Sequence, residues 1–394
     1  MRSVHVWMTR AALITLLVAT MAVPASADSV GWRMDGDGRF PDAEPPVTWS
    51  KNEGFVWKAD MPSWSNASPV LLADRNLIFV MSEPDEIIAV DAERGEIAWT
   101  DSMRSVTRDE PNAHDANGRT TATPVSDGKQ VFSVYGTGVV AAHTVGGERQ
   151  WARVIEEPGH RWGTSASPLL VDDRLIVHIV DLVALDPASG KEIWRVESEA
   201  SWGSPVTTRI GEVAVVITPA GDVFRVDDGK EIAREIGKLT YATPVVDDGI
   251  IYFIEKRATA VRIPSAIDQP FETLWTSRLK GSRHYASSLI HDGLIYAVSR
   301  EEFFAILDAA TGALLDERRL DLFEETNSAY PSLALAGDKI FLSTENGVTA
   351  ILRPGRTYDE IGRNDIETFR STPIFAGDRM YIRTVDHLYA FGTR

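Results

Sequence analysis

Cysteine is absent from the 394-residue chain. Its absence excludes disulfides, thiolate metal sites, a cysteine nucleophile and a lipid-modified N-terminal cysteine. Basic residues are also in the minority, with 40 Lys and Arg against 57 Asp and Glu and a net charge of −17. An acidic surface repels nucleic acid and anionic lipid headgroups, so we expect neither as a partner. The sequence also lacks a Ser-His-Asp order, a phosphate-binding Gly loop and a CxxC motif.

The N-terminus has the features of a signal peptide. Arg2 and Arg10 flank the start of a short apolar run from Ala11 to Val23, and Ala25 to Ala27 offers small residues for cleavage. We expect cleavage after Ala27, a periplasmic or secreted protein, and no membrane span after cleavage. The alternative is an uncleaved anchor, for which the apolar run is short. Cleavage removes two positive charges and no negative one, so the mature chain is more acidic still.

One sequence motif recurs through the rest of the chain. It consists of a Ser or Thr, an apolar run, a turn and a second apolar run. Successive copies are 37 to 55 residues apart, and a period near 40 is the length of a four-stranded propeller blade. The copies predict the inner hairpins of eight blades. Their first residues are Ser68, Thr123, Ser167, Ser204, Thr243, Ser287, Ser332 and Thr372.

The second half of each repeat predicts two further strands. In "AVDAERGEIAW" and "ALDPASGKEIW" an Asp precedes a turn, a Gly lies in the turn, and a Trp follows four residues later. We expect Trp99, Trp151 and Trp194 to pack between neighbouring blades, because aromatic rings bury a large area. Later repeats lose the pattern: Ala233 and Asp316 replace the Trp, and Trp275 lies in a lengthened repeat.

The eighth copy ends after three strands. Residues Gly54 to Met61, which include Trp57, precede the first copy and are expected to supply the missing strand. Pairing the two ends closes the ring and removes an open sheet edge. The sequence therefore predicts an all-β, eight-bladed propeller of four-stranded antiparallel blades, with an N-terminal strand closing the last blade. Its predicted span is 54–394.

Residues 28–53 are predicted to form an extended strap across one propeller face, with Trp32 and Phe40 as anchors. Asp35, Asp37 and Asp42 in this segment suggest calcium, but the ligand spacing and terminal Glu of a calcium loop are missing. We therefore expect no metal there.

The repeat "A-x-D-x-x-x-G-x-x-x-W" resembles that of the PQQ-like, or quinoprotein-type, β-propeller family, over nearly the whole mature chain. The resemblance implies the propeller fold. Functionally it implies either a calcium- and quinone-dependent dehydrogenase or a non-catalytic propeller like that of the outer-membrane barrel-assembly machinery, the BamB-like propellers, to which this chain is closest in size. The adjacent cysteines of the dehydrogenases are missing, and no repeat offers their Glu, Asn and Asp ligand set. The lipidated N-terminal cysteine usual in the assembly propeller is missing too.

The Ser or Thr that begins each repeat is called the marker residue, and its side chain the marker hydroxyl; the eight markers are expected to form a ring at the axis. A second ring of residues lies two positions before the markers, and it is the main candidate binding site. Four consecutive members are aromatic, and aromatic faces beside polar groups suit sugar, quinone or peptide ligands. The alternative is that the rings simply plug the channel. The ring comprises Asn66, Thr121, Ser165, Trp202, Tyr241, Tyr285, Tyr330 and Arg370, and Trp64 and Trp162 lie nearby in the sequence.

Loops between consecutive blades are expected on the same face as this ring. Three of their histidines suggest a metal, but no His-x-His or His-x-x-x-His spacing supports one, so the simpler interpretation is polar loop residues in separate blades. The loop residues added to the candidate site are His114, Asp115, His160, Arg161 and His284.

The function that the sequence favours is an exported, non-catalytic propeller acting as a protein- or peptide-binding or assembly scaffold. We expect a monomer without a cofactor. The alternatives are a quinone-dependent dehydrogenase-like enzyme and a carbohydrate-binding propeller. Tight binding of pyrroloquinoline quinone is not expected, because Arg370 is the only cation of the second ring, with Arg161 and Arg283 in adjoining loops.

Overall fold

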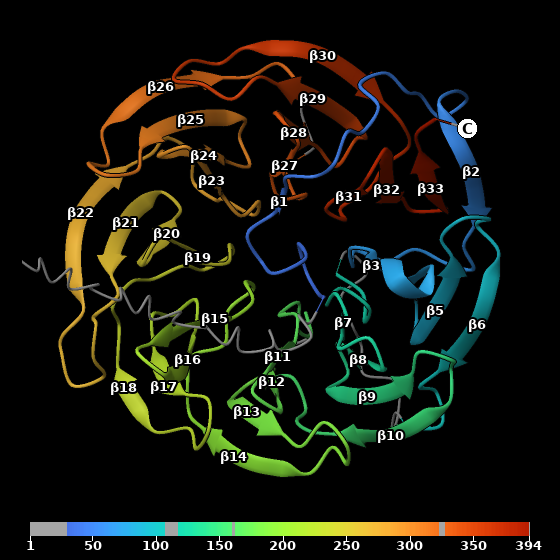
Figure 1. Cartoon of the computed structure of the whole chain (residues 1–394), viewed down its shortest axis with the longest axis horizontal. Coiled ribbons are helices and arrows are strands. Elements are labelled where there is room, and N and C mark those ends of the chain that lie inside the picture. Colours follow the sequence, from blue (N-terminus) through green and yellow to red (C-terminus); the bar gives the residue numbers. More distant parts are fainter. Residues whose placement is uncertain (1–29, 107–116, 160–161, 323–327, 394) are drawn as a thin grey trace, which may run out of the picture.

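Each of the eight sequence repeats folds into one antiparallel sheet. The computed structural model describes residues 30–106, 117–159, 162–322 and 328–393. In that part of the chain the eight sheets surround a central axis, with short strands inside and longer strands outside (Figure 1). The predicted eight-bladed propeller of four-stranded blades is confirmed.

The blades are numbered from the first repeat. Blades 1 and 2 comprise β3 (Val70–Leu72), β4 (Leu77–Ser82), β5 (Glu86–Asp91), β6 (Ile97–Ser102), β7 (Val125–Ser126), β8 (Gln130–Val134), β9 (Val139–Thr144) and β10 (Arg149–Val154). Blades 3 and 4 comprise β11 (Leu169–Val171), β12 (Arg174–His178), β13 (Leu182–Leu185), β14 (Glu192–Val196), β15 (Val206–Ile210), β16 (Val213–Ile217), β17 (Val223–Arg225) and β18 (Glu231–Ala233).

The second half of the ring repeats this order. Blades 5 and 6 comprise β19 (Val245–Asp247), β20 (Ile250–Ile254), β21 (Arg257–Arg262), β22 (Glu272–Arg278), β23 (Leu289–His291), β24 (Leu294–Val298), β25 (Phe303–Asp308) and β26 (Leu314–Arg319). Blades 7 and 8 comprise β27 (Ala334–Ala336), β28 (Lys339–Ser343), β29 (Val348–Leu352), β30 (Glu360–Asp365), β31 (Ile374–Ala376), β32 (Arg379–Arg383), β33 (His387–Phe391) and β2 (Phe55–Asp60). A short 3-10 helix, η1 (Ala73–Arg75), lies between β3 and β4.

The ring is closed by the pairing of the N-terminal strand with the last blade. β2 pairs antiparallel with β33, with Trp57 opposite Ala390. The strand predicted at Gly54 to Met61 is therefore in place and completes blade 8.

Tryptophans join five of the eight pairs of neighbouring blades. Each indole N–H donates to a backbone carbonyl of the next blade at 2.8–3.0 Å, and each ring lies against a glycine there. A Cβ on that glycine would lie 2.5–2.9 Å from the indole, which explains the paired Gly and Trp of the repeat. The donors are Trp57, Trp99, Trp151, Trp194 and Trp275, and their acceptors are Ala92, Val145, Pro187, Val226 and Ala309.

The predicted interblade position of Trp99, Trp151 and Trp194 is thus confirmed. Trp275 makes the same contact although its repeat is longer, because the extra residues, 263–271, lie in the hairpin between β21 and β22.

The N-terminal segment crosses the propeller axis (Figure 1). Val30 pairs with Ser126 of blade 2 in an isolated bridge, and β1 (Arg39–Phe40) then adds a fifth, parallel strand to blade 7 beside β27. Phe40 is buried and packs edge-on against Phe375 of blade 8 at 5.1 Å. The segment therefore lies as a strap over one end of the channel.

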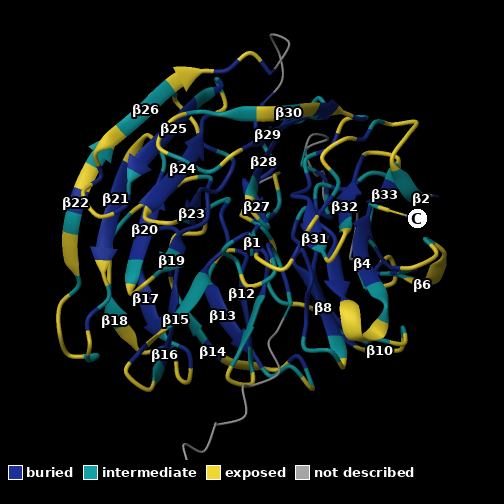
Figure 2. Cartoon of the chain, turned by 45° about the horizontal axis from the view of Figure 1, so that its top comes forward, coloured by how far each residue is buried: buried dark blue, intermediate teal, exposed yellow. Residues whose placement is uncertain are grey.

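Burial follows the position of a strand within its blade. Middle strands such as β20, β24 and β32 are almost wholly buried, whereas the outer strands β22 and β26 expose much of their length (Figure 2). Apolar side chains of neighbouring blades form shared clusters, one of which joins blades 2 and 3. The core is thus a set of interblade layers. Within the described residues, no helix has the length and apolarity to cross a membrane.

Candidate functional site

A closed circle of hydrogen bonds surrounds the propeller axis. The backbone N–H of each marker residue donates to the side-chain oxygen of the marker in the next blade, at 2.8–3.0 Å. The last bond runs from Thr372 of blade 8 to Ser68 of blade 1. This circle accounts for a small hydroxyl at the same position of all eight repeats, since a larger side chain would crowd the axis.

A cavity of about 510 Å³ lies on the axis. All eight marker hydroxyls line it, and so does every member of the second ring. The second-ring residues at the cavity are Asn66, Thr121, Ser165, Trp202, Tyr241, Tyr285, Tyr330 and Arg370. The rings therefore surround a space on the axis and do not fill it.

Blades 5 to 7 supply an arc of aromatic rings to this cavity, and blade 8 continues it with an arginine. Tyr241 meets Tyr285 edge-on at 5.1 Å, and Tyr285 stacks on Tyr330 at 4.5 Å with an interplanar angle of 3°. The Arg370 guanidinium then lies 4.3 Å from the centre of the Tyr330 ring. Such contacts hold the ring faces in fixed orientations. Trp162 and Trp202 form a further edge-on pair at 6.2 Å.

The opposite side of the cavity, from blades 1 to 3, is small and polar. The Asn66 amide donates to the Asn117 carbonyl at 3.1 Å and to the Thr121 hydroxyl at 3.3 Å. Ser165 donates to the Trp202 carbonyl at 2.7 Å. A ligand in this cavity would therefore meet ring faces on one side and amide and hydroxyl groups on the other.

Three arginines line the cavity, and its described lining contains no Asp, Glu, His or Lys. Arg283 donates to the Tyr285 hydroxyl at 3.1 Å and lies 5.8 Å from the Tyr241 ring. Arg300 bonds to the Ser328 hydroxyl at 3.3 Å. Arg370 forms an ion pair with Glu345, which lies outside the lining. The cavity is thus positively charged within an acidic protein.

The strap closes the cavity at one end. Trp32 lines this cavity and also a second one, of about 630 Å³, that lies between the strap and the inner strands of blades 2 to 5. Trp32, Ser167 and Ser204 thus lie where the two spaces adjoin. The neighbouring Arg33 is fully buried, and its guanidinium donates to the carbonyls of Ser288 and Leu333 at 2.7–3.1 Å.

Other residues of the predicted site lie elsewhere. His284 is 1% exposed, its Nδ1 has no hydrogen-bond partner, and burial lowers its pKa to about 4. It lies behind the cavity because adjacent residues of an extended chain alternate in direction, and Tyr285 takes the axial side. Trp64 packs near Gly118 and is not among the lining residues. His114, Asp115, His160 and Arg161 lie outside the described residues.

Sequence reasoning missed four lining residues, Trp32, Asn117, Gly203 and Arg300. Asn117 precedes the second ring by four residues, and Arg300 follows β24 on the loop to β25, so neither lies at a position the repeat marks. Trp32 comes from the strap, where we expected an anchor but not a wall of the cavity. The loop between the second and third strands of a blade lies on the same propeller face as the loops between blades. Only this shared location could have suggested Arg300.

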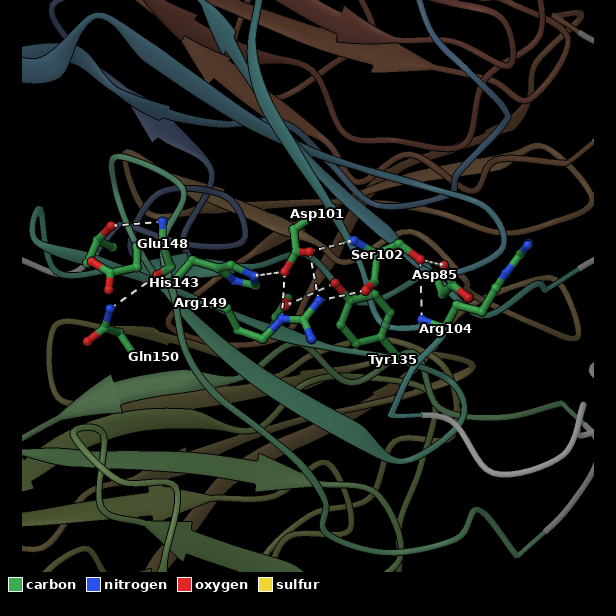
Figure 3. A network of polar contacts seen from close by, with 11 residues as sticks. Asp85, Asp101, Ser102, Arg104, Tyr135, His143, Glu148, Arg149 and Gln150 are labelled. Carbon is green, nitrogen blue, oxygen red and sulfur yellow. Dashed lines mark hydrogen bonds and ion pairs between the residues drawn. The ribbon is translucent and has the colours of Figure 1, made fainter.

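A polar network between blades 1 and 2 has a structural role (Figure 3). Asp101 receives hydrogen bonds from His143 and Arg149, each at 2.7 Å. A carboxylate only accepts, so the proton of neutral His143 lies on Nε2, and its Nδ1 is buried without a partner. Burial lowers the pKa of His143 against the opposing effect of Asp101. The imidazole is 0% exposed, so no substrate reaches it.

A group of possible metal ligands lies at the edge of blade 8. One side-chain ligand atom from each of Glu367, Asp386 and His387 lies within 4.8 Å of the others. Both ring nitrogens of His387 already contact carboxylates, of Glu367 at 2.8 Å and Asp60 at 3.3 Å. The imidazole is therefore already engaged by carboxylates, and the group is a polar network at the edge of the blade. In the strap, Asp37 is likewise engaged, by Arg39 at 2.5 Å.

Comparison with known proteins places the chain in a family. The family model described as outer membrane protein assembly factor BamB matches residues 28–179 and 178–393. This chain belongs to that PQQ-like propeller family. No curated protein matches it.

Solved structures similar to this BamB-like propeller include an assembly propeller and quinone-dependent dehydrogenases. BamB from Moraxella catarrhalis is 15% identical with a TM-score of 0.64, over 86% of this chain and 99% of that one. Quinohemoprotein alcohol dehydrogenase from Comamonas testosteroni is 12% identical with a TM-score of 0.62, over 87% and 76%. A europium-containing methanol dehydrogenase is 10% identical with a TM-score of 0.62, over 92% and 98%. At these identities the likeness concerns the fold.

The cavity of this BamB-like propeller does not fit a quinone held by a metal ion. A divalent or trivalent metal needs carboxylate or other oxygen ligands, and the described lining offers no carboxylate but three arginines. The chain also has no cysteine pair to stack on a quinone. We therefore derive no redox step for it.

Proposed function

We propose that this chain is an exported, non-catalytic propeller that binds a peptide segment of a partner protein in the axial cavity. It would act as a binding or assembly scaffold in the periplasm. The observation that carries the proposal is the lining itself: ordered aromatic faces and amides surround about 510 Å³, without a general base or a metal-binding carboxylate among the described residues.

Three observations support a non-catalytic, peptide-binding role. The Tyr285 and Tyr330 ring faces suit apolar or aromatic side chains, and Asn66 and Asn117 suit backbone amides. The marker hydroxyls accept hydrogen bonds in the closed circle, and the described lining holds no base beside them, so they are poor nucleophiles. The family description, an assembly factor, is consistent with a protein partner.

Selection from a random peptide library, followed by calorimetry with the selected peptides, tests the proposal. The variant Tyr285→Ala with Tyr330→Ala removes the stacked pair, and we expect it to weaken binding by about tenfold or more, as for buried aromatic contacts. The matched control, Tyr285→Phe with Tyr330→Phe, keeps both ring faces and should stay within a few-fold of the original affinity. Failure to select any peptide, or equal affinity for the alanine variant, would refute the proposal.

Export is the second part of the proposal and has its own test. We expect the mature chain in a periplasmic fraction to begin at Asp28, as determined by mass spectrometry of its N-terminal peptide. Recovery of residues 1–27 on the mature protein would contradict cleavage.

A further inference from the structure

The floor of the axial cavity is built from hydrogen-bond donors. Each of the eight marker oxygens accepts one backbone N–H, and among the described residues none of these hydroxyls donates a hydrogen bond in return. All eight line the cavity and are 2–6% exposed. A hydroxyl whose oxygen already accepts still carries one proton to donate. The circle therefore presents unused O–H groups to whatever enters the axis.

A buried positive charge lies directly beside this floor. Arg33 is 0% exposed, and its guanidinium bonds to the carbonyls of Ser288 and Leu333, each one residue after a marker hydroxyl. Its Nε has no hydrogen-bond partner, and the nearby Asp35 and Asp37 carboxylates of the strap raise its pKa against the larger effect of burial. Burial lowers its pKa to about 10, so it stays charged at neutral pH. Arg33 does not line the cavity, so its charge acts on a ligand there only at longer range.

The walls carry the same sign of charge. Arg283 and Arg300 are exposed on the cavity side, and only Arg370 has a carboxylate partner, Glu345, among the described residues. Hydroxyl donors at the floor and the Arg283 and Arg300 guanidiniums at the walls favour an anion. This matches the chemistry of a carboxylate, which accepts several hydrogen bonds at once.

We propose that the cavity takes the carboxylate at the free C-terminus of a peptide, directed toward the hydroxyl circle. The inference rests on the proposed function and specifies its ligand. The strap crosses the axis at one end and its Trp32 lines the cavity, so a chain that enters from the other end stops at the strap. The side chain before the terminus then lies against the Tyr285 and Tyr330 rings.

Benzoate and benzamide provide a test of the anion site that does not depend on peptide binding. They share a ring and differ in charge, and calorimetry or ligand-observed NMR on the mature chain measures both. We expect benzoate to bind at least tenfold more tightly, and its affinity to fall as NaCl rises. Arg283→Gln with Arg300→Gln should remove most of that preference and leave benzamide unchanged. Arg278→Gln, an exposed position outside the cavity, is the matched control.

Equal binding of the two probes, or a preference that survives Arg283→Gln with Arg300→Gln, would overturn the anion site even if peptides bind. Selected peptides, prepared with a free and with an amidated C-terminus, then identify the source of the carboxylate. At least tenfold weaker binding of the amidated form supports the C-terminal assignment. Equal binding of both forms refutes it, and competition by sulfate equal to that by benzoate would show a general anion site.

Discussion

Five junctions between blades hold a tryptophan from an outer strand and three do not, and the two groups are built differently. Wherever the Trp is present, the residue opposite it in the sheet is alanine, as with Ala89 and Trp99 or Ala142 and Trp151. Where the Trp is missing, a larger β-branched residue takes the alanine position, opposite a small or charged residue. These pairs are Val223 with Ala233, Ile306 with Asp316, and Ile351 with Gly362. The volume removed from one strand is thus partly restored on its neighbour.

Each junction without an outer-strand tryptophan is also filled by residues from outside the regular strands. Between blades 4 and 5 the lengthened hairpin of blade 5 supplies Ile263, Ile267 and Phe271. Between blades 6 and 7 the added residue is Tyr358, from the loop between β29 and β30, whose backbone N–H donates to the Asp316 carboxylate. Between blades 7 and 8 the filler is Trp49, which precedes β2 and stacks on Phe341 at 6.1 Å. Loss of the repeat motif therefore does not mean loss of the junction.

The closing strand makes the largest contribution, since it supplies both a strand and a Trp. Deleting residues 54–61 should abolish the cooperative transition or lower the melting temperature by more than about 10 °C, because blade 8 loses its outer strand and blade 1 loses the Trp57 contact. Calorimetry of the deletion against a chain that lacks only residues 1–27 measures this. An unchanged melting temperature would show that closure is not needed.

Trp151 tests the Trp-containing group. It is 8% exposed and packs against Gly190, so Trp151→Ala should lower the free energy of unfolding by about 3–5 kcal/mol. Gly190→Ala should also destabilise, since its φ is +65° and the added Cβ would lie 2.5 Å from the indole. Urea unfolding measures both. A loss well under about 1 kcal/mol for Trp151→Ala would mean that the indole is not a structural contact.

Trp49 tests whether the strap truly replaces a missing blade residue. It is 4% exposed, its backbone N–H donates to the Asn364 side chain at 3.0 Å, and we expect Trp49→Ala to cost about 3 kcal/mol. Trp32→Ala, at a partly exposed strap position, is the comparison and should cost less. If the order of the two were reversed, the strap would stabilise the fold through the axis and not through the junction of blades 7 and 8.

Acid should destabilise the junction that contains Trp99, which is the Trp-containing junction with a buried histidine beside the indole. Trp99 stacks on His143 at 5.7 Å, and burial lowers the pKa of that histidine. Unfolded histidine gains a proton near pH 6.5 and the folded one only at lower pH, so this stabilisation is complete above 6.5 and declines as the pH falls below it. Urea unfolding between pH 7.5 and 5 should show a shallower decline for His143→Gln than for the unmodified chain. Identical slopes would contradict the assignment.

The sequence predicted the ring because its repeat marks geometry that every blade must share: a hydroxyl at the axis and a glycine in the outer turn. The second ring follows the same period, so all eight of its members could be predicted at the cavity by counting, and Trp162 from its place in a neighbouring loop. Arg300 and Trp32 could not, because they enter from positions without a periodic signal. Trp49 and the Asp316 to Tyr358 bond were missed for the same reason, since only the three-dimensional structure shows which segment fills a gap.

Asp316 provides the smallest effect and sets the lower limit of the comparison. Its carboxylate accepts the Tyr358 N–H at 2.8 Å and pairs with Arg318 at 2.6 Å, on a side chain that is 13% exposed. We expect Asp316→Ala to lower the free energy of unfolding by about 1 kcal/mol, because water reaches the freed N–H and Tyr358 keeps its edge-on contact with Phe304 at 5.5 Å. Asp338→Ala, whose side chain is 85% exposed, should change it by less than about 0.5 kcal/mol. Urea unfolding at pH 7 compares them. A loss as large as that of Trp151→Ala would mean that this hydrogen bond stabilises its junction as much as a buried indole does. The two groups of junctions would then differ in sequence but not in stability.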